Sequence, residues 1–414
     1  MSGLTRSPHF VAKAGRASPS PTVRYAETRV VGDGLAHPVC VARPGLTRSP
    51  FCGTSEKKTR EEDTTMAVTT QPFGALRDGR EAHLYTITSS TGSGVTLTDF
   101  GAAIVKVLVP DGLGRVEDVA LGFDSLDLYE QDLGNFGAVC GRFANRLARA
   151  SLPLDRRVYP LTRNDGPNTL HGGAVGFHHK LWDARILGED AVRFSLFSPD
   201  GEEGFPGDLR ASVTYRFSAE NVLSLSYEAA AGERNTVANL TNHSYWNLDG
   251  HTFGSALDHS IRVHASRFTP TNEWNVPDGR LLPVKGVFDL RAYRPLREGV
   301  LSRNEQIVKV NGYDHNFVLD GYDGKSLFKA ADVKGAVSGR RMEVWTTLPG
   351  VQLYTGNHFS GFEGKGGMRY NKYAGVALET QFFPDSPHHP AWPQPKVAAG
   401  ETQRSQTEFR FFVE

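Results

Sequence analysis

Apolar and polar residues alternate along several stretches of the chain from about residue 80 onward. In 209–217 every second residue is apolar, and the residues between them are Arg, Ser and Thr. Successive side chains of a strand point to opposite faces of a sheet, so this period predicts strands with one buried and one solvated face. The same alternation occurs at 192–196, 223–227 and 409–411.

Gly and Pro clusters separate these stretches, at 199–207, 277–279 and 349–350. Such clusters favour turns between strands. Many short strands with few helices are typical of a large antiparallel β-sandwich or barrel, so we predict an all-β fold. A chain of 414 residues is long enough for two or three domains. No change of composition after residue 80 indicates a second one, and we expect a single domain over 66–414.

The first 65 residues differ from the rest in charge and composition. They contain ten basic and six acidic residues, a net charge of +4, which leaves −4 for 66–414 because the whole chain has 46 of each sign. The segment is rich in Ser, Pro, Gly and Arg and repeats GLTRSP at 3–8 and 45–50. We predict a disordered basic leader over 1–65.

Three interpretations of this leader are open. It is a genuine basic or transit-like segment, a flexible tail without a role, or upstream sequence that is translated because the start is placed too early. In the third case, which we favour, Met66 is the true first residue.

Charge balance and cysteine content disfavour several classes of protein. Proteins that bind nucleic acid or anionic membranes usually carry an excess of Lys and Arg, whereas this chain has a net charge of zero, so we expect neither partner. Three widely spaced cysteines, Cys40, Cys52 and Cys140, make neither a disulfide framework nor a tetrahedral zinc site. No membrane-length apolar run or secretory signal is present. These features favour a cytoplasmic protein.

Five segments combine His, Arg, Asp or Glu with aromatic or amide residues. They are GRFANR (141–146), NTLHGG (168–173), NLTNHSYWNL (239–248), YDHNFVLD (313–320) and VALETQFFPD (376–385). Such a mixture of hydrogen-bonding and apolar groups is expected where a polyhydroxylated ligand binds, and a sugar is the natural guess. The sequence has no metal-binding, phosphate-binding, dinucleotide or GxSxG motif. We therefore expect no metal, and the commonest hydrolase, NTPase and NAD-dependent functions are disfavoured.

Taken singly, the residues of these segments leave alternatives open. Glu379 follows an apolar run, which favours partial burial and a raised pKa, but a Glu on the solvated face of a strand fits equally well. A lone histidine such as His171 is more often structural than catalytic. Arg146 fits a salt bridge as well as a binding site, and Arg142 is an equal candidate.

Together and in this order, the five segments resemble the aldose 1-epimerase (galactose mutarotase) family. The resemblance runs from about Phe73 to Glu414 and includes TDFGAAIVKVLVPD (98–111), DVALGFDSLDLYE (118–130), SPDGEEGFPG (198–207) and LPGVQLYTGN (348–357). Residues 1–65 have no counterpart in it, which favours the early-start interpretation. The chain departs from the family pattern at Trp246, at Phe382–Phe383 and in the tail 398–406, so the preferred sugar is an open question.

The resemblance implies a large antiparallel β-sandwich with the sugar in an open cleft across one sheet. It implies an isomerase that interconverts the α and β anomers of free hexoses such as glucose and galactose, without cofactor. Glu379 would be the general base and His243 the general acid. Five further residues would bind and orient the sugar hydroxyls: Asn145, Arg146, His171, Asp314 and Gln352. We expect a small aldose as the partner and a monomer or weak homodimer.

Three alternatives remain at this point. An epimerase of hexose 6-phosphates or other modified sugars would need an Arg cluster for the phosphate, and only scattered arginines are present. A non-catalytic carbohydrate-binding module would not need both His243 and Glu379. A glycosidase needs two carboxylates flanking the bond that it breaks, and Glu379 with Asp314 would have to supply them.

Overall fold

The computed structural model describes residues 65–131 and 133–414. The prediction of a disordered leader falls on 1–65, and all of that range except Thr65 lies outside the described residues. Strands dominate the described part, and its α-helices are three short ones: α1 (Leu126–Glu130), α2 (Leu296–Val300) and α3 (Glu305–Val310). None of the helices in these ranges is long and apolar enough to cross a membrane. The predicted all-β class with antiparallel sheets is confirmed.

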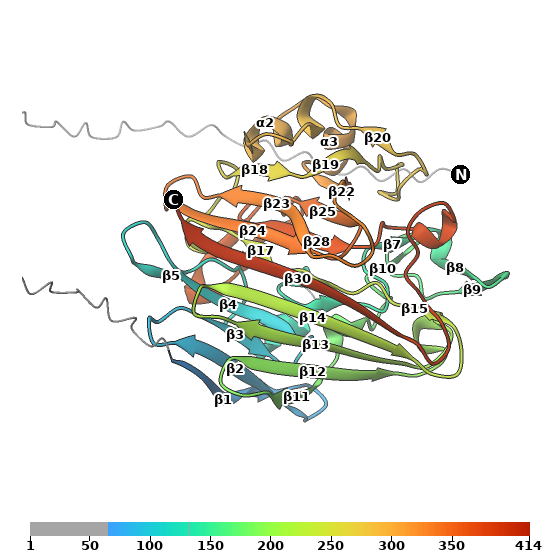
Figure 1. Ribbon diagram of the computed structural model, residues 1–414, viewed down its shortest axis with the longest axis horizontal. Coiled ribbons are helices and arrows are strands. Elements are labelled where there is room, and N and C mark those ends of the chain that lie inside the picture. Colours follow the sequence, from blue (N-terminus) through green and yellow to red (C-terminus); the bar gives the residue numbers. More distant parts are fainter. Residues whose placement is uncertain (1–64, 132) are drawn as a thin grey trace, which may run out of the picture. The chain divides into compact units, whose positions relative to one another are not determined.

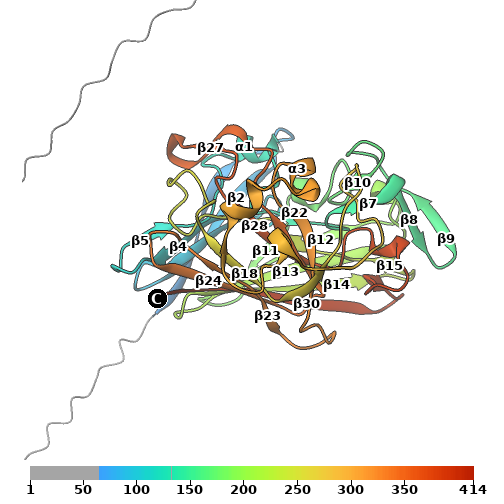
Figure 2. The same ribbon diagram turned by 90° about the horizontal axis from the view of Figure 1, so that it is seen from above.

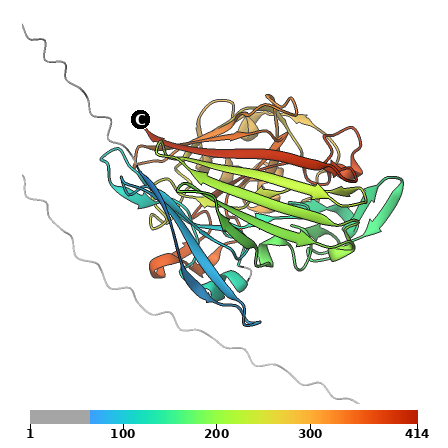
Figure 3. The ribbon, with the colours of Figure 1, turned by 60° about the horizontal axis from the view of Figure 1, so that its bottom comes forward.

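The largest sheet has nine antiparallel strands. In spatial order they are β11 (Asp183–Ile186), β12 (Ala191–Ser198), β13 (Leu209–Phe217), β14 (Val222–Ala231), β30 (Thr402–Val413), β24 (Arg340–Thr346), β23 (Phe328–Lys334), β18 (Ser260–Val263) and β21 (Arg294–Pro295). The long strands lie side by side in Figures 1 and 3. β13 has the bounds that the alternation at 209–217 indicates, and all its apolar residues are buried, with Ser212 the one buried polar residue among them.

A second, six-stranded sheet carries most of the polar segments. Its order is β17 (Tyr245–Trp246), β28 (Val376–Gln381), β25 (Gly350–Tyr354), β22 (Asp314–Leu319), β19 (Ala265–Phe268) and β20 (Leu282–Pro283). It packs face to face on the nine-stranded sheet: Thr380 of β28 hydrogen-bonds Thr407 of β30 at 2.6 Å, and Trp246 contacts Phe409 with ring centroids 4.8 Å apart. In Figure 2, β22 and β28 form the layer above β13, β14 and β30.

A third sheet of five strands covers one end of this sandwich. It consists of β1 (Met66–Ala75), β2 (Glu81–Ser89), β3 (Gly94–Thr98), β4 (Ala103–Pro110) and β5 (Val116–Asp118). Its Tyr85 packs edge-on against Phe194 of β12, and Tyr215 of β13 donates its hydroxyl to the carbonyl of Ala102 at 2.6 Å. Apolar residues of all three sheets share the largest core cluster, and two smaller clusters complete the core of the described residues.

Short strand pairs and 3₁₀ turns connect the sheets. The pairs are β6 (Val139–Cys140) with β16 (Thr241–Asn242), β7 (Arg146–Leu147) with β10 (Thr169–Leu170), β8 (Ser151–Leu154) with β9 (Arg157–Pro160), β15 (Thr236–Val237) with β29 (Lys396–Val397), and β26 (Ser360–Glu363) with β27 (Arg369–Asn371). The 3₁₀ turns are η1 (Ala148–Ala150), η2 (Phe177–His179), η3 (Glu202–Gly204), η4 (Gly286–Phe288), η5 (Lys365–Gly367) and η6 (Ser386–His388).

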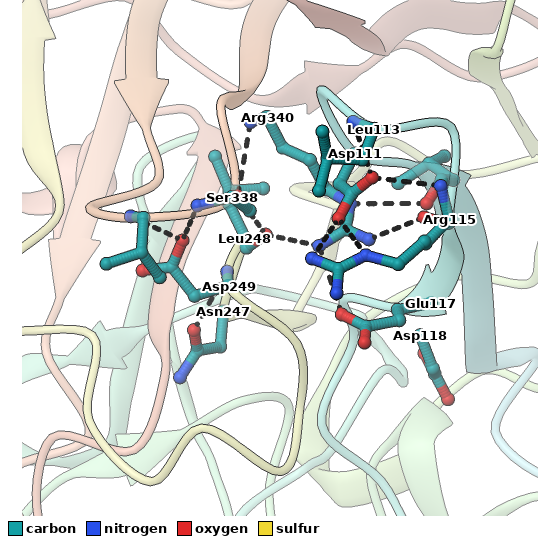
Figure 4. Close-up of polar contacts among 12 residues, drawn as sticks. Asp111, Leu113, Arg115, Glu117, Asp118, Asn247, Leu248, Asp249, Ser338 and Arg340 are labelled. Atoms are coloured by element: carbon teal, nitrogen blue, oxygen red, sulfur yellow. Dashed lines mark hydrogen bonds and ion pairs between the residues drawn. The ribbon is translucent and has the colours of Figure 1, made fainter. Parts of the chain in front are cut away.

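A buried arginine joins the five-stranded sheet to the nine-stranded one (Figure 4). Arg340 of β24 is 1% exposed and donates to the carbonyls of Val109, Leu248 and Arg115 at 3.0–3.2 Å. Close by, the carboxylate of Asp249 accepts backbone N–H groups of 336–338 at 2.9–3.0 Å. We call these two side chains and their partners the Arg340 cluster. A buried charge is tolerated when hydrogen bonds replace its water, as they do here.

Candidate active site

Three adjacent strands of the six-stranded sheet place carboxylates and an amide on one face. On β28, Val376 and Leu378 point into the core between the sheets, so Glu379 points to the other face. Gln352 of β25 lies directly opposite Glu379 in the register, with Val351 and Leu353 in the core. Asp314 of β22 reaches the same place diagonally: the Gln352 amide donates to Asp314 Oδ1 at 2.6 Å.

His243 reaches Glu379 from the turn between β16 and β17. Its backbone is held on both sides, since its N–H donates to the carbonyl of Ala138 and its own carbonyl accepts from the N–H of Gly137. β17 pairs with β28, which brings the imidazole beside the carboxylate. The His243 Nε2 to Glu379 Oε1 distance is 3.6 Å, and the two side chains are 6% and 2% exposed.

Asn145, Arg146 and His171 come from the strand pair β7 and β10. Asn145 and His171 both have a left-handed backbone, with φ of 62° and 49°. The His171 N–H donates to the Asn145 carbonyl at 3.1 Å, and the Asn145 N–H donates to His171 Nδ1 at 3.2 Å. Because Nδ1 accepts, the proton of a neutral imidazole sits on Nε2, and this hydrogen bond fixes His171 as a donor. Its ring packs edge-on against that of His243, with centroids 5.3 Å apart.

Arg146 spans the site between two carboxylates. Its Nε donates to Asp165 Oδ2 at 2.8 Å, and its Nη1 lies 4.0 Å from Asp314 Oδ2. Asn275, from the loop after β19, donates its side-chain amide to the same Asp314 oxygen at 2.5 Å. The Asn145 side chain turns back and accepts from the Arg146 N–H at 2.8 Å, so Asn145 holds the backbone of both Arg146 and His171.

The structure therefore brings all seven predicted site residues to one place. Three of their side-chain atoms are buried without a hydrogen-bond partner among the described residues, namely Glu379 Oε2, His243 Nδ1 and Gln352 Oε1, and so is Oδ1 of the neighbouring Asn275. Buried polar groups are normally paired, because an unpaired one costs roughly 1–3 kcal/mol. Atoms left unpaired in this way are ready to bind a polar ligand.

Burial shifts the protonation of the acid–base candidates. It raises the pKa of Glu379 well above its ordinary value, the charge of Asp314 raises it further, and Arg146 opposes both. Burial lowers the pKa of His243 to about 4 and that of His171 well below its ordinary value. Both directions disfavour charge, as expected for groups removed from water. The uncharged forms of Glu379 and His243 are therefore favoured.

His171, His243 and Glu379 also have the spacing of a metal site, with one ligand atom each within 4.8 Å of the others. A histidine binds a metal ion through the lone pair of a ring nitrogen. The backbone N–H of Asn145 already occupies the lone pair of His171 Nδ1, so Nε2 carries the proton. This donor set fits proton transfer and sugar hydroxyls better than a cation.

Of the two arginines that the sequence left as equal candidates, Arg146 lies in the cluster and Arg142 does not. Arg142 is 2% exposed and donates to the carbonyls of Ser198 and Gly207 at 2.9 and 2.6 Å, away from the cluster. The alternative of a solvated Glu379 is wrong, because Glu379 is 2% exposed. Sequence reasoning missed Asp165 and Asn275. Both lie in loops without a period, and only their contacts with Arg146 and Asp314 identify them.

Comparisons with known proteins agree with this geometry. The family model described as aldose 1-epimerase matches residues 83–410. Galactose mutarotase of Homo sapiens is 42% identical over 321 residues, which are 77% of this chain and 91% of the relative. Aldose 1-epimerase of Escherichia coli is 37% identical over 341 residues, 81% of this chain and 97% of the relative. The crystal structure of galactose 1-epimerase from Lactobacillus acidophilus superposes with a TM-score of 0.73 at 27% identity, over 84% of this chain and 99% of that one.

The matched region contains all seven residues of the cluster, and the shared fold is the sandwich described above. Sequence, fold and site thus lead to one conclusion: the chain belongs to the aldose 1-epimerase family of isomerases.

Proposed function

We propose that the protein interconverts the α and β anomers of free hexoses, galactose and glucose among them, with Glu379 as general base and His243 as general acid. The observation that carries this proposal is the buried pair itself. A carboxyl and an imidazole stand 3.6 Å apart, and hydroxyl-binding groups surround them. The neighbouring carboxylate, Asp314, is engaged by the side-chain amides of Gln352 and Asn275.

Mutarotation needs one base and one acid. Glu379 takes the proton of the anomeric hydroxyl while His243 gives one to the ring oxygen, and the ring opens to the aldehyde. Rotation about the C1–C2 bond then presents the other face of the carbonyl. The same two groups, with their roles exchanged, close the ring as the opposite anomer.

The pair holds one proton between its two members throughout this cycle. Ring opening starts from ionised Glu379 and protonated His243, and ring closure starts from the reverse. The directions of the two pKa shifts favour the uncharged arrangement, with the proton on Glu379. A cyclic sugar must therefore bind with a proton shift from Glu379 to His243. Arg146 assists because its charge lowers the pKa of Glu379.

The remaining side chains orient the sugar. Arg146 and His171 Nε2 are donors that can stabilise negative charge on sugar oxygens, an effect that is largest in a site shielded from water. Asp314 and Gln352 Oε1 are acceptors for hydroxyl groups. Asn145 positions Arg146 and His171, a role that its hydrogen bonds with both residues support. A cytoplasmic location and a monomeric or weakly dimeric state stay predictions.

Polarimetry tests the proposal. Freshly dissolved α-D-galactose, α-D-glucose, xylose and arabinose are followed to anomeric equilibrium with and without the enzyme, and glucose 6-phosphate is added to test the phosphosugar alternative. We expect at least one free aldose to equilibrate far faster than in buffer. A trace no faster than buffer with every sugar would overturn the assignment. A clear preference for glucose 6-phosphate would transfer the function to modified sugars.

A further inference from the structure

Asp385 is a buried carboxylate close to the site that the proposed mechanism does not use. It ends the segment VALETQFFPD, which carries Glu379, and it is 3% exposed with a left-handed backbone, φ 60°. Burial alone would raise the pKa of Asp385, but hydrogen bonds from His388 and His389 lower it overall. A buried charge is tolerated only with such partners, so the contacts of Asp385 show which parts of the chain it holds together.

Asp385 holds the backbone on the carboxyl side of Arg146. Its N–H donates to the Arg146 carbonyl at 2.9 Å, and its Oδ1 accepts the N–H of Ala148 at 2.8 Å. These two hydrogen bonds span Leu147, the second residue of β7. The loop after β28, drawn in red, lies beside β7 and β8 in Figure 1. Asp385 therefore ties the segment that carries Glu379 to the segment that carries Arg146.

His388 and Ser151 close a ring of hydrogen bonds on Ala148. Nδ1 of His388 donates to Asp385 Oδ1 at 2.6 Å, and Nε2 of His388 lies 3.1 Å from the Ser151 hydroxyl. The same hydroxyl is 3.1 Å from the carbonyl of Ala148. Both backbone groups of Ala148 are thus engaged, the N–H by Asp385 and the carbonyl by Ser151.

The turn that follows β7 has an unfavourable backbone. Arg149 and Ala150 are both left-handed, with φ of 56° and 45°. This conformation costs energy in residues other than Gly, and it persists where the surrounding contacts fix it. If the ring of hydrogen bonds opened, the turn would relax, and β7 would move with it because it directly precedes the turn.

The place of Arg146 matters to the acid–base pair. Its Nη1 lies 4.0 Å from Asp314 Oδ2, and its charge lowers the pKa of Glu379. Charge interactions weaken with distance, and misplacing a binding group by ~1 Å can lower a rate about 100-fold. Asp165 holds the guanidinium end of Arg146, and Asp385 holds its backbone end.

We infer that Asp385 is a positioning residue, which holds Arg146 in the place where Arg146 serves Glu379 and the sugar. His388 and Ser151 support Asp385 in this role through the ring on Ala148. The inference rests on the proposed function, because it assigns Asp385 a part in that reaction. Since Asp385 acts through Arg146, its removal should matter only while Arg146 is present.

A double-mutant cycle tests this dependence. Asp385→Gly removes the carboxylate and still allows the left-handed backbone, whereas Asp385→Asn keeps an oxygen that accepts the N–H of Ala148. The kcat/KM of galactose or glucose mutarotation should fall about 10-fold in Asp385→Gly, and Asp385→Asn should retain most of the wild-type value. In an Arg146→Met background, assayed at higher enzyme concentration, Asp385→Gly should change kcat/KM by less than about twofold, because the group that Asp385 positions is gone.

Asp332→Gly is the matched control. Asp332 is another buried carboxylate, 4% exposed, and it hydrogen-bonds Nε2 of His264 at 2.8 Å, but it lies on β23 of the nine-stranded sheet. This variant should lose stability in urea denaturation and keep the wild-type kcat/KM per folded molecule.

The inference is overturned if Asp385→Gly keeps the wild-type kcat/KM, or if it lowers kcat/KM by the same factor with and without Arg146. The proposed function survives either result. If Asp385→Gly does not fold, His388→Phe and Ser151→Ala replace it in the cycle, and each should lower kcat/KM about threefold only while Arg146 is present. A wild type that turns over no sugar overturns the proposed function and the inference with it.

Discussion

Two buried polar clusters of this protein, the Arg340 cluster and the acid–base pair with its neighbours, differ in how completely they are paired. Every guanidinium nitrogen of Arg340 donates to a carbonyl or to Glu117, and both oxygens of Asp249 accept backbone N–H groups (Figure 4). In the other cluster, Glu379 Oε2 and His243 Nδ1 are buried without a partner among the described residues. The two charged side chains of the first cluster are fully paired, whereas Glu379 and His243 of the second are not.

The pKa shifts show the same contrast. Burial alone would raise the pKa of Asp249, but the charge of His259 and hydrogen bonds from backbone N–H groups lower it overall. Burial raises the pKa of Glu379, and only Arg146 opposes it. A buried carboxylate with full pairing stabilises the fold, whereas one without it is held in an unfavourable state that suits proton transfer. The variants below separate these two roles.

Glu379→Gln should have the largest effect, lowering kcat about 1,000-fold in the polarimetric assay while KM changes little, because it removes the group that accepts the anomeric proton. The free energy of unfolding at pH 7 should stay the same or rise. The folded state binds the Glu379 proton more tightly than the unfolded state, so ionisation at neutral pH works against folding. Near-normal turnover would remove Glu379 from the mechanism.

Arg340→Met should have the opposite effects: a large loss of stability and little change in kcat. Removing one member of a buried, hydrogen-bonded charge network costs about 3–5 kcal/mol, so urea denaturation should show a loss of that size. The kcat of the folded enzyme should stay within about twofold of wild type. Arg297→Met is the control, because Arg297 and its partner Asp258 are both about half exposed, and such a surface pair contributes about 1 kcal/mol or less. Equal losses of unfolding free energy in both variants would contradict the claim that the buried Arg340 stabilises the fold more than a surface arginine does.

His243→Asn should lower kcat about 100-fold, because it removes the proposed general acid. Stability at pH 7 should change little, because the wild-type imidazole is neutral at this pH in the folded state and in most of the unfolded chains. Polarimetry and urea denaturation measure the two effects. A wild-type rate would require another acid, and His171 is the first candidate because its Nε2 proton is fixed by the hydrogen bond at Nδ1.

The smallest effect concerns acid stability. The pKa of His243 is about 4 in the folded state, whereas an imidazole in the unfolded chain has the ordinary value of 6.5. Between these two pH values the unfolded state binds more protons than the folded state, so the free energy of unfolding falls as the pH is lowered. Between pH 7 and 5 this group should cost roughly 2 kcal/mol. Urea denaturation at pH 7 and pH 5 should show this loss of unfolding free energy in wild type. In His243→Asn the loss between the two pH values should be smaller by about the same amount. An identical pH dependence would disprove the buried neutral imidazole.

The sequence predicted the sheets better than it predicted the site. Alternation identified β13, because one of its faces is exposed to solvent. It could not place Glu379, because β28 is buried on both faces and its residues show no alternation of exposure. Arg146 and His171 lie at strands of two residues, where no period can develop, and only their order in the resemblance to a family singled them out. Asn275 and Asp165 had no local signal, since distant contacts define them.

Saturation transfer by proton NMR on galactose at anomeric equilibrium tests the central claim most directly. Irradiating the β anomeric proton should reduce the α anomeric signal when wild-type enzyme is present in catalytic amounts, because the two anomers exchange on the enzyme. With Glu379→Gln at the same concentration the α signal should match that of buffer. No transfer with folded wild-type protein, for galactose and glucose alike, would contradict anomer interconversion at the Glu379–His243 pair.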